Sequence, residues 1–293
     1  MYRARSPFQA SRGWRLSEIK EIDLGVITGS GVYELSGGSF EEERRVVASR
    51  FGEAEVAIFC VGGWRVGAIS RHLRGHFHLP NTIPHRANLA ALKLLGARAV
   101  LATTSVGAVA SGVVPGRPVV FDDLYFPDNR LPDGGLCTIF DEPGERGRGH
   151  LISSEPFSPK LRRRLEKAAS EVCREVTPGG IYAHTNGPRF ETASEIRALA
   201  SFGVAAVSQT CGPEAILAGE LEMPYALVGF PVNYATGIGE IETKKDLERL
   251  IARSSEVLPR IVLEAAANLE EADLTNSSGY IYRIEGELGR GTE

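Results

Sequence analysis

Six short polar segments of the chain carry residue types that could bind an anion and a planar ring. The first, Thr28-Gly29-Ser30-Gly31, directly follows an apolar run. Glycines let backbone N–H groups converge there, and the Ser30 hydroxyl adds a donor, so this turn could hold a phosphate. It is not a dinucleotide fingerprint, because Gly31 is followed by Val-Tyr-Glu-Leu and the third glycine is missing. A plain tight turn explains the segment equally well.

Two further segments offer donors of the kind that phosphate requires. The segment Arg71-His72-Leu73-Arg74-Gly75-His76 is dense in guanidinium and imidazole groups. A guanidinium presents a planar fork of donors that matches phosphate oxygens, although the segment taken alone fits a solvated loop better. Thr103-Thr104-Ser105 closes a strand candidate, at the kind of strand end where open α/β sheets bind ligands. Its hydroxyls could equally cap the next turn.

The remaining three segments could meet a planar heterocycle. Phe190 and Glu191 could stack on a base and accept a hydrogen bond from its ring N–H. The alternative is a hydrophobic staple and a first-turn carboxylate of the next helix. Ser208-Gln209-Thr210-Cys211-Gly212-Pro213-Glu214, where a strand is expected to give way to a helix, is rich in hydroxyl and amide donors, and Asn233 ends an apolar strand candidate. Polar groups at several strand ends together predict a pocket for an anion and a planar heterocycle.

Short apolar runs that alternate with longer helical patterns must position these segments, and this alternation predicts an α/β sheet with crossover helices. Pro directly after Ser158, and Glu195 three residues after Thr192, are typical of helix starts. The strand candidates are Leu24–Thr28, Val56–Val61, Ala99–Thr103, Val119–Phe121, Gly180–Thr185, Ala205–Ser208 and Tyr225–Val232. Helices are expected over Arg86–Leu95, from Ser158-Pro159 through Val176, from Thr192 to Gly203, and from Thr243 to about Glu271 with a kink at Pro259.

The domain organisation is expected to be simple. Residues 1–20 are rich in Arg and Ser and are expected to form a loosely ordered lead-in, followed by a single domain over residues 21–293. Residues 122–150 are dominated by Asp, Pro, Gly and Arg with little periodicity. A loop of that length inside a compact domain is usually functional or packed against a partner subunit.

The bulk composition favours a protein that acts on small molecules. The chain has 293 residues and a net charge of -4, which indicates neither a nucleic-acid-binding surface nor a membrane-binding one. Its four cysteines are widely spaced, so neither a zinc site nor a disulfide scaffold is expected. The N-terminus lacks an apolar signal region, and the longest apolar stretch, around Val56–Val61, is too short to span a bilayer. A cytoplasmic location is therefore expected.

The order and the sequences of the motifs resemble those of the trimeric purine nucleoside phosphorylase and methylthioadenosine phosphorylase family. The resemblance extends from about Leu24 to Gly237. The most specific blocks are RANLAALKLLGARAVLATTSVGAV, EPFSP at Glu155–Pro159, and NGPRFETASEIR with the later GPEAILAGELEMPYALVGFPVNYATG. The resemblance implies a single α/β domain around a mixed, partly barrel-like central sheet flanked by helices. It also implies a homotrimer or a dimer of trimers, in which the 122–150 region approaches a neighbouring subunit's active site.

The resemblance further implies roles for individual residues. Phe190 would lie against the purine, Glu191 and Asn233 would meet its polar edge, and Gln209 would face the ribose. Glu191, Asn233 and His72 would form the catalytic set. Phosphate would be held by Ser30, Arg71, His72, Thr104, the backbone N–H of Ser105, and Thr210.

The implied reaction is phosphorolytic cleavage of the N-glycosidic bond of a purine nucleoside, which yields the free base and a ribose 1-phosphate. Departure of the base leaves oxocarbenium character on the ribose, and a bound phosphate dianion stabilises that charge before it attacks. The protein must therefore position phosphate and sugar in line within a preorganised electrostatic site. Inorganic phosphate is a co-substrate, and neither a metal nor an organic cofactor is expected.

Glu191 and Asn233 favour a 6-oxopurine. A carboxylate accepts a hydrogen bond from N1–H of hypoxanthine or guanine, whereas N1 of adenine is itself an acceptor. Adenine-specific members of the family tend to have a small hydroxyl residue and Asp at these positions. A site that leaves a buried polar group unpaired discriminates strongly between such bases.

Three alternatives remain open on the sequence alone. The segment after Gly237 aligns with neither subgroup, so a methylthioadenosine or methylthioinosine phosphorylase is the nearest rival. Gln209 stands where the family usually has Met, and Asn186 where Glu is common, which suggests a catalytically impaired nucleoside-binding protein. The Asn-Tyr that usually precedes the Arg-Ala-Asn motif is replaced by Pro84-His85. A nicotinamide-dependent oxidoreductase rests only on two glycines of the first segment.

Overall fold

The computed structural model describes residues 21–30, 32, 35, 40–145, 147–239, 243–276 and 279–283. The expected lead-in at residues 1–20 and Gly31 of the first segment lie outside the described residues. Along the chain the elements are β1 (Leu24–Thr28), β2 (Glu43–Ser49), β3 (Gly52–Val61), β4 (Trp64–Ser70), η1 (Pro80–Thr82), α1 (His85–Leu94), β5 (Ala99–Ala108), β6 (Val119–Val120), β7 (Asp123–Tyr125), β8 (Gly149–Ile152), α2 (Pro159–Val172), β9 (Thr177–Pro178), β10 (Ile181–His184), α3 (Ala193–Ser201), β11 (Val204–Ser208), α4 (Cys211–Glu220), β12 (Tyr225–Tyr234), α5 (Lys244–Ala267), η2 (Glu271–Leu274) and β13 (Tyr280–Arg283).

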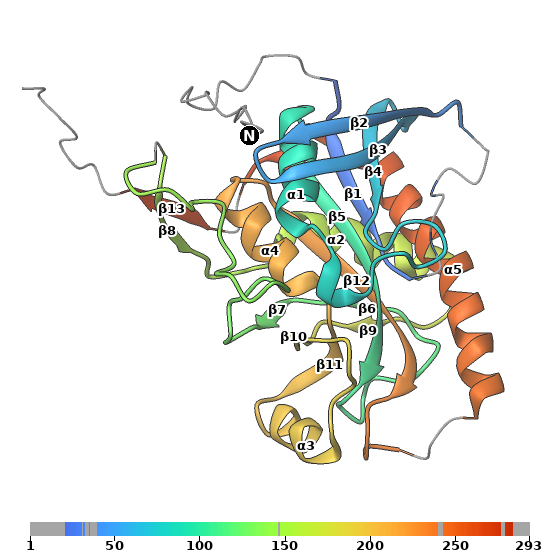
Figure 1. Ribbon diagram of the computed structural model, residues 1–293. Helices are drawn as coiled ribbons and strands as arrows, with labels where there is room; N and C mark the ends of the chain where they lie inside the picture. The colour runs from blue at the N-terminus through green and yellow to red at the C-terminus, as the bar shows by residue number, and fades with distance from the viewer. Residues whose placement is uncertain are drawn as a thin grey trace, which may run out of the picture.

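Strand β5 organises a mixed sheet, which within the described residues has eleven strands. One edge of β5 pairs in parallel with β12, from Tyr225 opposite Val100 to Tyr234 opposite Ala108. The other edge pairs in parallel with β1 as far as Ala102, and then antiparallel with β11 at Gly107 and Ala108. Strands β1 to β4 and strands β10 and β11 therefore diverge toward opposite ends of the molecule (Figure 1).

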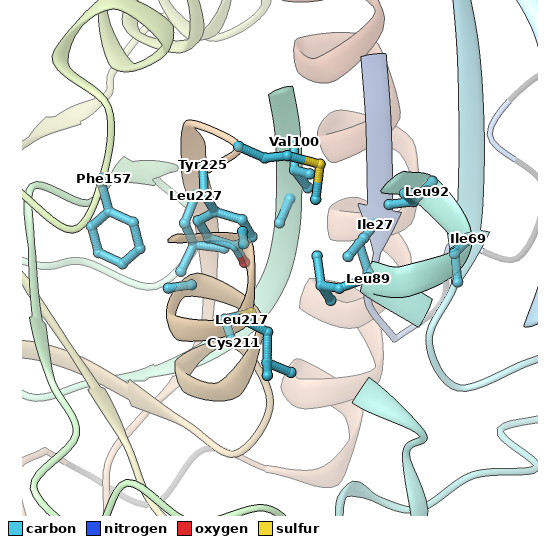
Figure 2. Close-up of a cluster of buried hydrophobic side chains, with 14 of the residues drawn as sticks. Ile27, Ile69, Leu89, Leu92, Val100, Phe157, Cys211, Leu217, Tyr225 and Leu227 are labelled. Atoms are coloured by element: carbon cyan, nitrogen blue, oxygen red, sulfur yellow. The ribbon is translucent and has the colours of Figure 1, made fainter. Parts of the chain in front are cut away.

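The central strands bury both of their faces, as expected for parallel strands covered by helices. Alternate residues of β5 belong to two different cores, with Val100 and Ala102 in one and Ala99 and Leu101 in the other. The first core contains Leu89 and Leu92 of α1 and Leu217 of α4 (Figure 2). The second contains Leu161 and Leu165 of α2 together with Ile261 and Val262 of α5. Each fully buried Leu or Ile contributes about 1.5–3 kcal/mol to the free energy of unfolding. The packing of these helices on both faces therefore stabilises the central strands.

The helix boundaries confirm some of the expected start signals and correct others. Thr192 and Glu195 form a complete capping box at the start of α3. Ser158 occupies the N-cap position of α2, but its hydroxyl makes no capping bond and is buried without a hydrogen-bond partner. The long helix α5 contains Pro259 and ends at Ala267 instead of near Glu271. Beyond it the chain turns into the separate 3₁₀ helix η2.

Candidate active site

The first group of expected site residues stands where β1 and β4 end beside the middle of β5, which continues to Ala108 instead of ending at Thr103 as expected. Parallel pairing aligns Thr28 of β1 with Ser70 of β4, and Ile27 of β1 with Ala102 of β5. The residues that follow β1 and β4 therefore lie beside Thr103 to Ser105 within β5, because β1 pairs in parallel with both of its neighbours and its pairing with β5 stops at Ala102. We call this place the phosphate corner; it is formed by Gly29, Ser30, Arg71, His72, Thr103, Thr104 and Ser105.

The phosphate corner is tightly packed around Gly29. Its N–H donates a hydrogen bond to the Thr103 hydroxyl at 3.2 Å. A Cβ atom at this position would lie 2.8 Å from Nη1 of Arg71 and 3.0 Å from the Thr103 carbonyl oxygen. A side chain there would displace the guanidinium, so the backbone approach requires glycine.

Arg71 is the buried cation of this corner and is only 1% exposed. Its Nε and Nη2 atoms donate to the two carboxylate oxygens of Glu214 at 2.6 and 2.9 Å. Its Nη1 donates to the Thr103 carbonyl oxygen at 2.7 Å. Burial opposes the charge, but the facing carboxylate outweighs burial, so the pKa of Arg71 is raised above its ordinary value. The guanidinium is thus a permanent positive charge with a fixed orientation.

Glu214 closes the polar segment that begins at Ser208, but no role was predicted for it from the sequence. It lies in the first turn of α4 with 0% exposure, and its Oε2 also accepts a hydrogen bond from the Tyr225 hydroxyl at 2.9 Å. Nδ1 of His85 is 3.9 Å from its other carboxylate oxygen. Burial, with Arg71 nearby, lowers the pKa of His85 to about 3. The signal in the sequence that could have identified Glu214 is its position as an acidic residue among the apolar residues of α4.

His72 is held as a neutral ring at the same corner. Its Nδ1 lies 2.7 Å from the His78 carbonyl oxygen, and since a carbonyl only accepts, Nδ1 carries the proton. The ring stacks on His76 with 4.1 Å between centroids. Burial and the charge of Arg71 lower the pKa of His72 to about 4. Its Nε2 is therefore an acceptor, suited to the hydroxyl of a monoprotonated phosphate.

The next donors lie along the edge of β5 in the gap between β1 and β11, and they are buried. Thr104 lies in this gap, and its hydroxyl is 3.2 Å from the Ser208 hydroxyl at the end of β11. The Ser105 hydroxyl is buried without a hydrogen-bond partner. Thr210, at the start of α4, has its hydroxyl 3.4 Å from the Cys211 sulfur, which in turn is 3.6 Å from Nη2 of Arg71. These contacts place Thr210 beside the phosphate corner, to which Thr104 belongs.

The second group of expected residues stands at the ends of β10 and β12. The Thr185 hydroxyl donates a hydrogen bond to Oε1 of Glu191, whose side chain is only 8% exposed. Asn233 lies opposite Gly107 of β5, and its Nδ2 donates to the Tyr234 carbonyl at 2.8 Å. Strands β11 and β5 separate the two, and no hydrogen bond joins Glu191 to Asn233 among the described residues. The Phe190 ring is 79% exposed.

Gln209 turns toward the segment that precedes Glu191. Its Nε2 donates a hydrogen bond to the Arg189 carbonyl oxygen at 2.7 Å. A Cβ atom on Gly187 would lie 2.8 Å from Cδ of Gln209, so the amide packs directly on that glycine. The side chain thus makes its contacts with the loop after β10.

Two cavities of the described structure do not coincide with this set of residues. A cavity of about 630 Å³ is lined by Arg117, Tyr234 and Arg253 and includes none of the expected site residues. A smaller one of about 370 Å³ is lined by Thr28, Ser70 and neighbouring residues, next to the phosphate corner. In the part of the chain that the structure describes, no group of three or more His, Cys, Asp or Glu side chains could hold a metal ion. None of the helices described is long and apolar enough to cross a membrane.

Comparison with known proteins shows the family of the chain. The family model described as "Phosphorylase superfamily" matches residues 23–267. The 6-oxopurine nucleoside phosphorylase of Pyrococcus furiosus is 36% identical over 83% of this chain and 91% of its own length. A probable S-methyl-5'-thioinosine phosphorylase of Methanopyrus kandleri is 37% identical over 82% and 89%. The solved methylthioadenosine phosphorylase of Schistosoma mansoni in complex with adenine is 27% identical, covers 84% of this chain and 91% of its own, and superposes with a TM-score of 0.75. From its sequence and its fold, this chain belongs to the phosphorylase superfamily.

Proposed function

We propose that the enzyme cleaves the N-glycosidic bond of 6-oxopurine nucleosides with inorganic phosphate and releases the free base and ribose 1-phosphate. The observation that carries this proposal is the close approach of Gly29, which precedes Ser30, to the buried Arg71 guanidinium and to Thr104 of β5. A buried, permanently charged guanidinium beside hydroxyl donors is suited to a phosphate dianion.

The phosphate corner performs the first task of the reaction. Arg71 supplies positive charge, while the hydroxyls of Ser30, Thr104 and Thr210 and the N–H of Ser105 supply donors. The monoprotonated phosphate donates its own hydroxyl to Nε2 of His72, which fixes the orientation of the dianion. One phosphate oxygen forms a bond to C1′ of the ribose as the bond from C1′ to the purine nitrogen breaks. Positioning and electrostatic stabilisation provide the rate enhancement.

Glu191 and Asn233 perform the second task, which is to recognise the base and stabilise the negative charge that develops on it. The Thr185 hydroxyl bonds Oε1 of Glu191, so Oε2 is available to accept from N1–H of the purine. The Asn233 amide would meet the N7 and O6 edge, and Phe190 would lie against the ring. No metal or organic cofactor takes part, and inorganic phosphate is the co-substrate.

A second candidate substrate is methylthioinosine. It shares the 6-oxopurine base, and the Methanopyrus kandleri relative at 37% identity is named a probable S-methyl-5'-thioinosine phosphorylase. The two candidates differ only at the 5′ position of the sugar. Glu191 and Asn233 would recognise the base in the same way in both.

The proposed enzyme is a homotrimer or a dimer of trimers that acts in the cytoplasm in the salvage of purines. Leu136, in the 122–150 region, is 62% exposed, and Phe190 is 79% exposed. Large apolar side chains on such segments are suited to cover by a neighbouring subunit. Light scattering on the purified protein tests this assembly, and a monomer at assay concentration would contradict it.

A phosphorolysis panel tests the proposed function. The protein is incubated with inosine, guanosine, methylthioinosine or methylthioadenosine, each with and without phosphate. We expect cleavage of the 6-oxopurine substrates only when phosphate is present. Cleavage of methylthioadenosine alone would overturn the base assignment. If calorimetry shows purine binding and none of the substrates is cleaved, the chain is a nucleoside-binding protein.

A further inference from the structure

The segment 186–190, here called the base loop, leads into Glu191 and contains neither helix nor strand. Its first end is tied by the Thr185 N–H, which donates to the Ser208 carbonyl at 3.1 Å. Its last end is tied by Arg189, whose Nη1 and Nη2 donate to Glu195 on α3 at 2.8 and 2.7 Å. Between these ends, the position of the backbone depends on contacts with other elements.

Gln209 supplies the first of these contacts. Its Nε2 donates to the Arg189 carbonyl at 2.7 Å, and its Cδ would be 2.8 Å from a Cβ on Gly187. One amide therefore both bonds and packs on the base loop from the end of β11. The Met that usually stands at this position in the family has no donor for that carbonyl.

Asn186, the first residue of the base loop, supplies the second contact. Its Nδ2 donates to Oδ2 of Asp128 at 3.0 Å, in the turn that follows β7. Asp128 belongs to the long 122–150 region. Two of the positions where this chain departs from the family pattern thus supply side-chain contacts of the base loop.

We propose that Gln209 and Asn186 are positioning residues that fasten the base loop and so hold Phe190 and Glu191 ready for the purine. A loop held in its binding conformation loses less conformational freedom when the ligand arrives, and the ligand therefore binds more tightly. The inference rests on the proposed function, since it takes Phe190 and Glu191 to meet the base. It differs from a role of Gln209 as a contact of the ribose.

The variant Gln209→Met tests the first fastening and restores the residue that is usual in the family. We expect the KM for inosine to rise roughly 3- to 10-fold, the range that follows from the loss of one net hydrogen bond. The KM for phosphate should stay at the wild-type value, because the phosphate corner does not depend on the base loop. Hydrogen exchange of a peptide covering 186–191 should become faster. An unchanged KM for inosine with unchanged exchange would overturn the inference.

A substrate comparison separates fastening from a ribose contact. Loosening the base loop raises the KM for inosine and for 2′-deoxyinosine by the same factor. If Gln209→Met instead raises the KM for inosine and leaves that for 2′-deoxyinosine unchanged, Gln209 binds the 2′-hydroxyl and the fastening role is wrong.

The Asn186–Asp128 contact allows a test by exchange of partners. Asn186→Asp places two carboxylates together, so it should raise the KM for inosine and speed exchange of the base loop. The double variant Asn186→Asp with Asp128→Asn restores a donor and an acceptor in reversed order, and it should recover both values. Failure of the double variant to recover either value would overturn the role of Asn186.

The exchange measurement keeps this inference distinct from the proposed function. If the wild-type protein cleaves no purine nucleoside while Gln209→Met still speeds exchange of the base loop, the fastening stands and the proposed function fails. If the wild type cleaves inosine while both variants match it in KM and in exchange, the proposed function stands and the fastening fails.

Discussion

Arg71 and Glu214, which are 143 residues apart in the sequence, form a bidentate ion pair in which neither side chain is more than 1% exposed. The pair joins the loop after β4 to the first turn of α4. The pair therefore fixes the orientation of the Arg71 guanidinium in the phosphate corner. Nη1 of Arg71 also donates a hydrogen bond to the Thr103 carbonyl oxygen at 2.7 Å.

Glu214→Gln should weaken both stability and phosphate binding. The change leaves the buried Arg71 without a compensating charge, which costs roughly 3–5 kcal/mol of the free energy of unfolding. The KM for phosphate should rise more than the KM for inosine. Urea unfolding and initial rates measure the two effects. Glu175→Gln, which breaks an exposed pair with Arg117, is the control and should change stability by less than about 1 kcal/mol.

Gly29→Ala should disturb the phosphate corner, because the backbone of residue 29 lies close to Arg71 and Thr103. The added Cβ meets Nη1 of Arg71 at 2.8 Å and the Thr103 carbonyl oxygen at 3.0 Å. We expect a loss of about 1–3 kcal/mol in the free energy of unfolding, as for overpacked sites, and a higher KM for phosphate. Gly112→Ala is the matched control, because its Cβ would meet nothing within 4 Å. Equal effects of the two substitutions would contradict the packing argument.

Glu191→Gln should reduce turnover of inosine without affecting phosphate binding. Hydrogen bonds to charged groups contribute roughly 1.5–3 kcal/mol, so kcat/KM for inosine should fall about 10- to 150-fold. Thr185→Val keeps the carboxylate and removes only the hydroxyl that orients it, so its effect should be smaller. An inosine kcat/KM that is unchanged in Glu191→Gln would show that this carboxylate does not meet the base.

Stability should fall as the pH drops below about 6.5. Burial lowers the pKa of His72 to about 4 and those of His85 and His184 to about 3. In the unfolded chain these rings take up protons at higher pH than in the folded chain, so acid favours unfolding. Each ring contributes a slope of roughly 1.4 kcal/mol per pH unit between its unfolded and folded pKa.

Urea unfolding at pH 7, 6 and 5 measures this slope. His184→Leu removes one of the three rings, and it should make the pH dependence shallower while leaving its sign unchanged. A free energy of unfolding that is equal at pH 7 and pH 5 would contradict the assignment of the buried rings as neutral.

Much of the fold could be predicted from apolar runs and caps, but elements with weak local signals could not. The run Leu24–Thr28 coincides with β1, and the capping box at Thr192 marks α3 as expected. Strand β2 was missed because five of its seven residues are charged, small or polar and none is buried. Helix α4 begins within the segment 208–214, where a change from strand to helix was expected, although Gly and Pro stand in its first turn and it has no side-chain cap. Its stability comes from packing against the first core, which a local pattern does not reveal.

In the candidate site, too, some residues could be predicted from local patterns and others could not. Ser30, Arg71 and Thr104 could be proposed locally, because each follows an apolar run, although β5 continues past Thr104 to Ala108. Glu214 could not, because its partner is 143 residues away and only the fold brings them together. The hydrogen bond from Gln209 to the Arg189 carbonyl could not be predicted from the sequence either. It depends on how the loop after β10 packs against the end of β11.

Release of hypoxanthine from inosine, measured with and without inorganic phosphate, tests the central claim most directly. The account predicts release only in the presence of phosphate, with one equivalent of ribose 1-phosphate formed for each hypoxanthine. Release that is independent of phosphate, with free ribose as the product, would contradict it, as would the absence of release under both conditions.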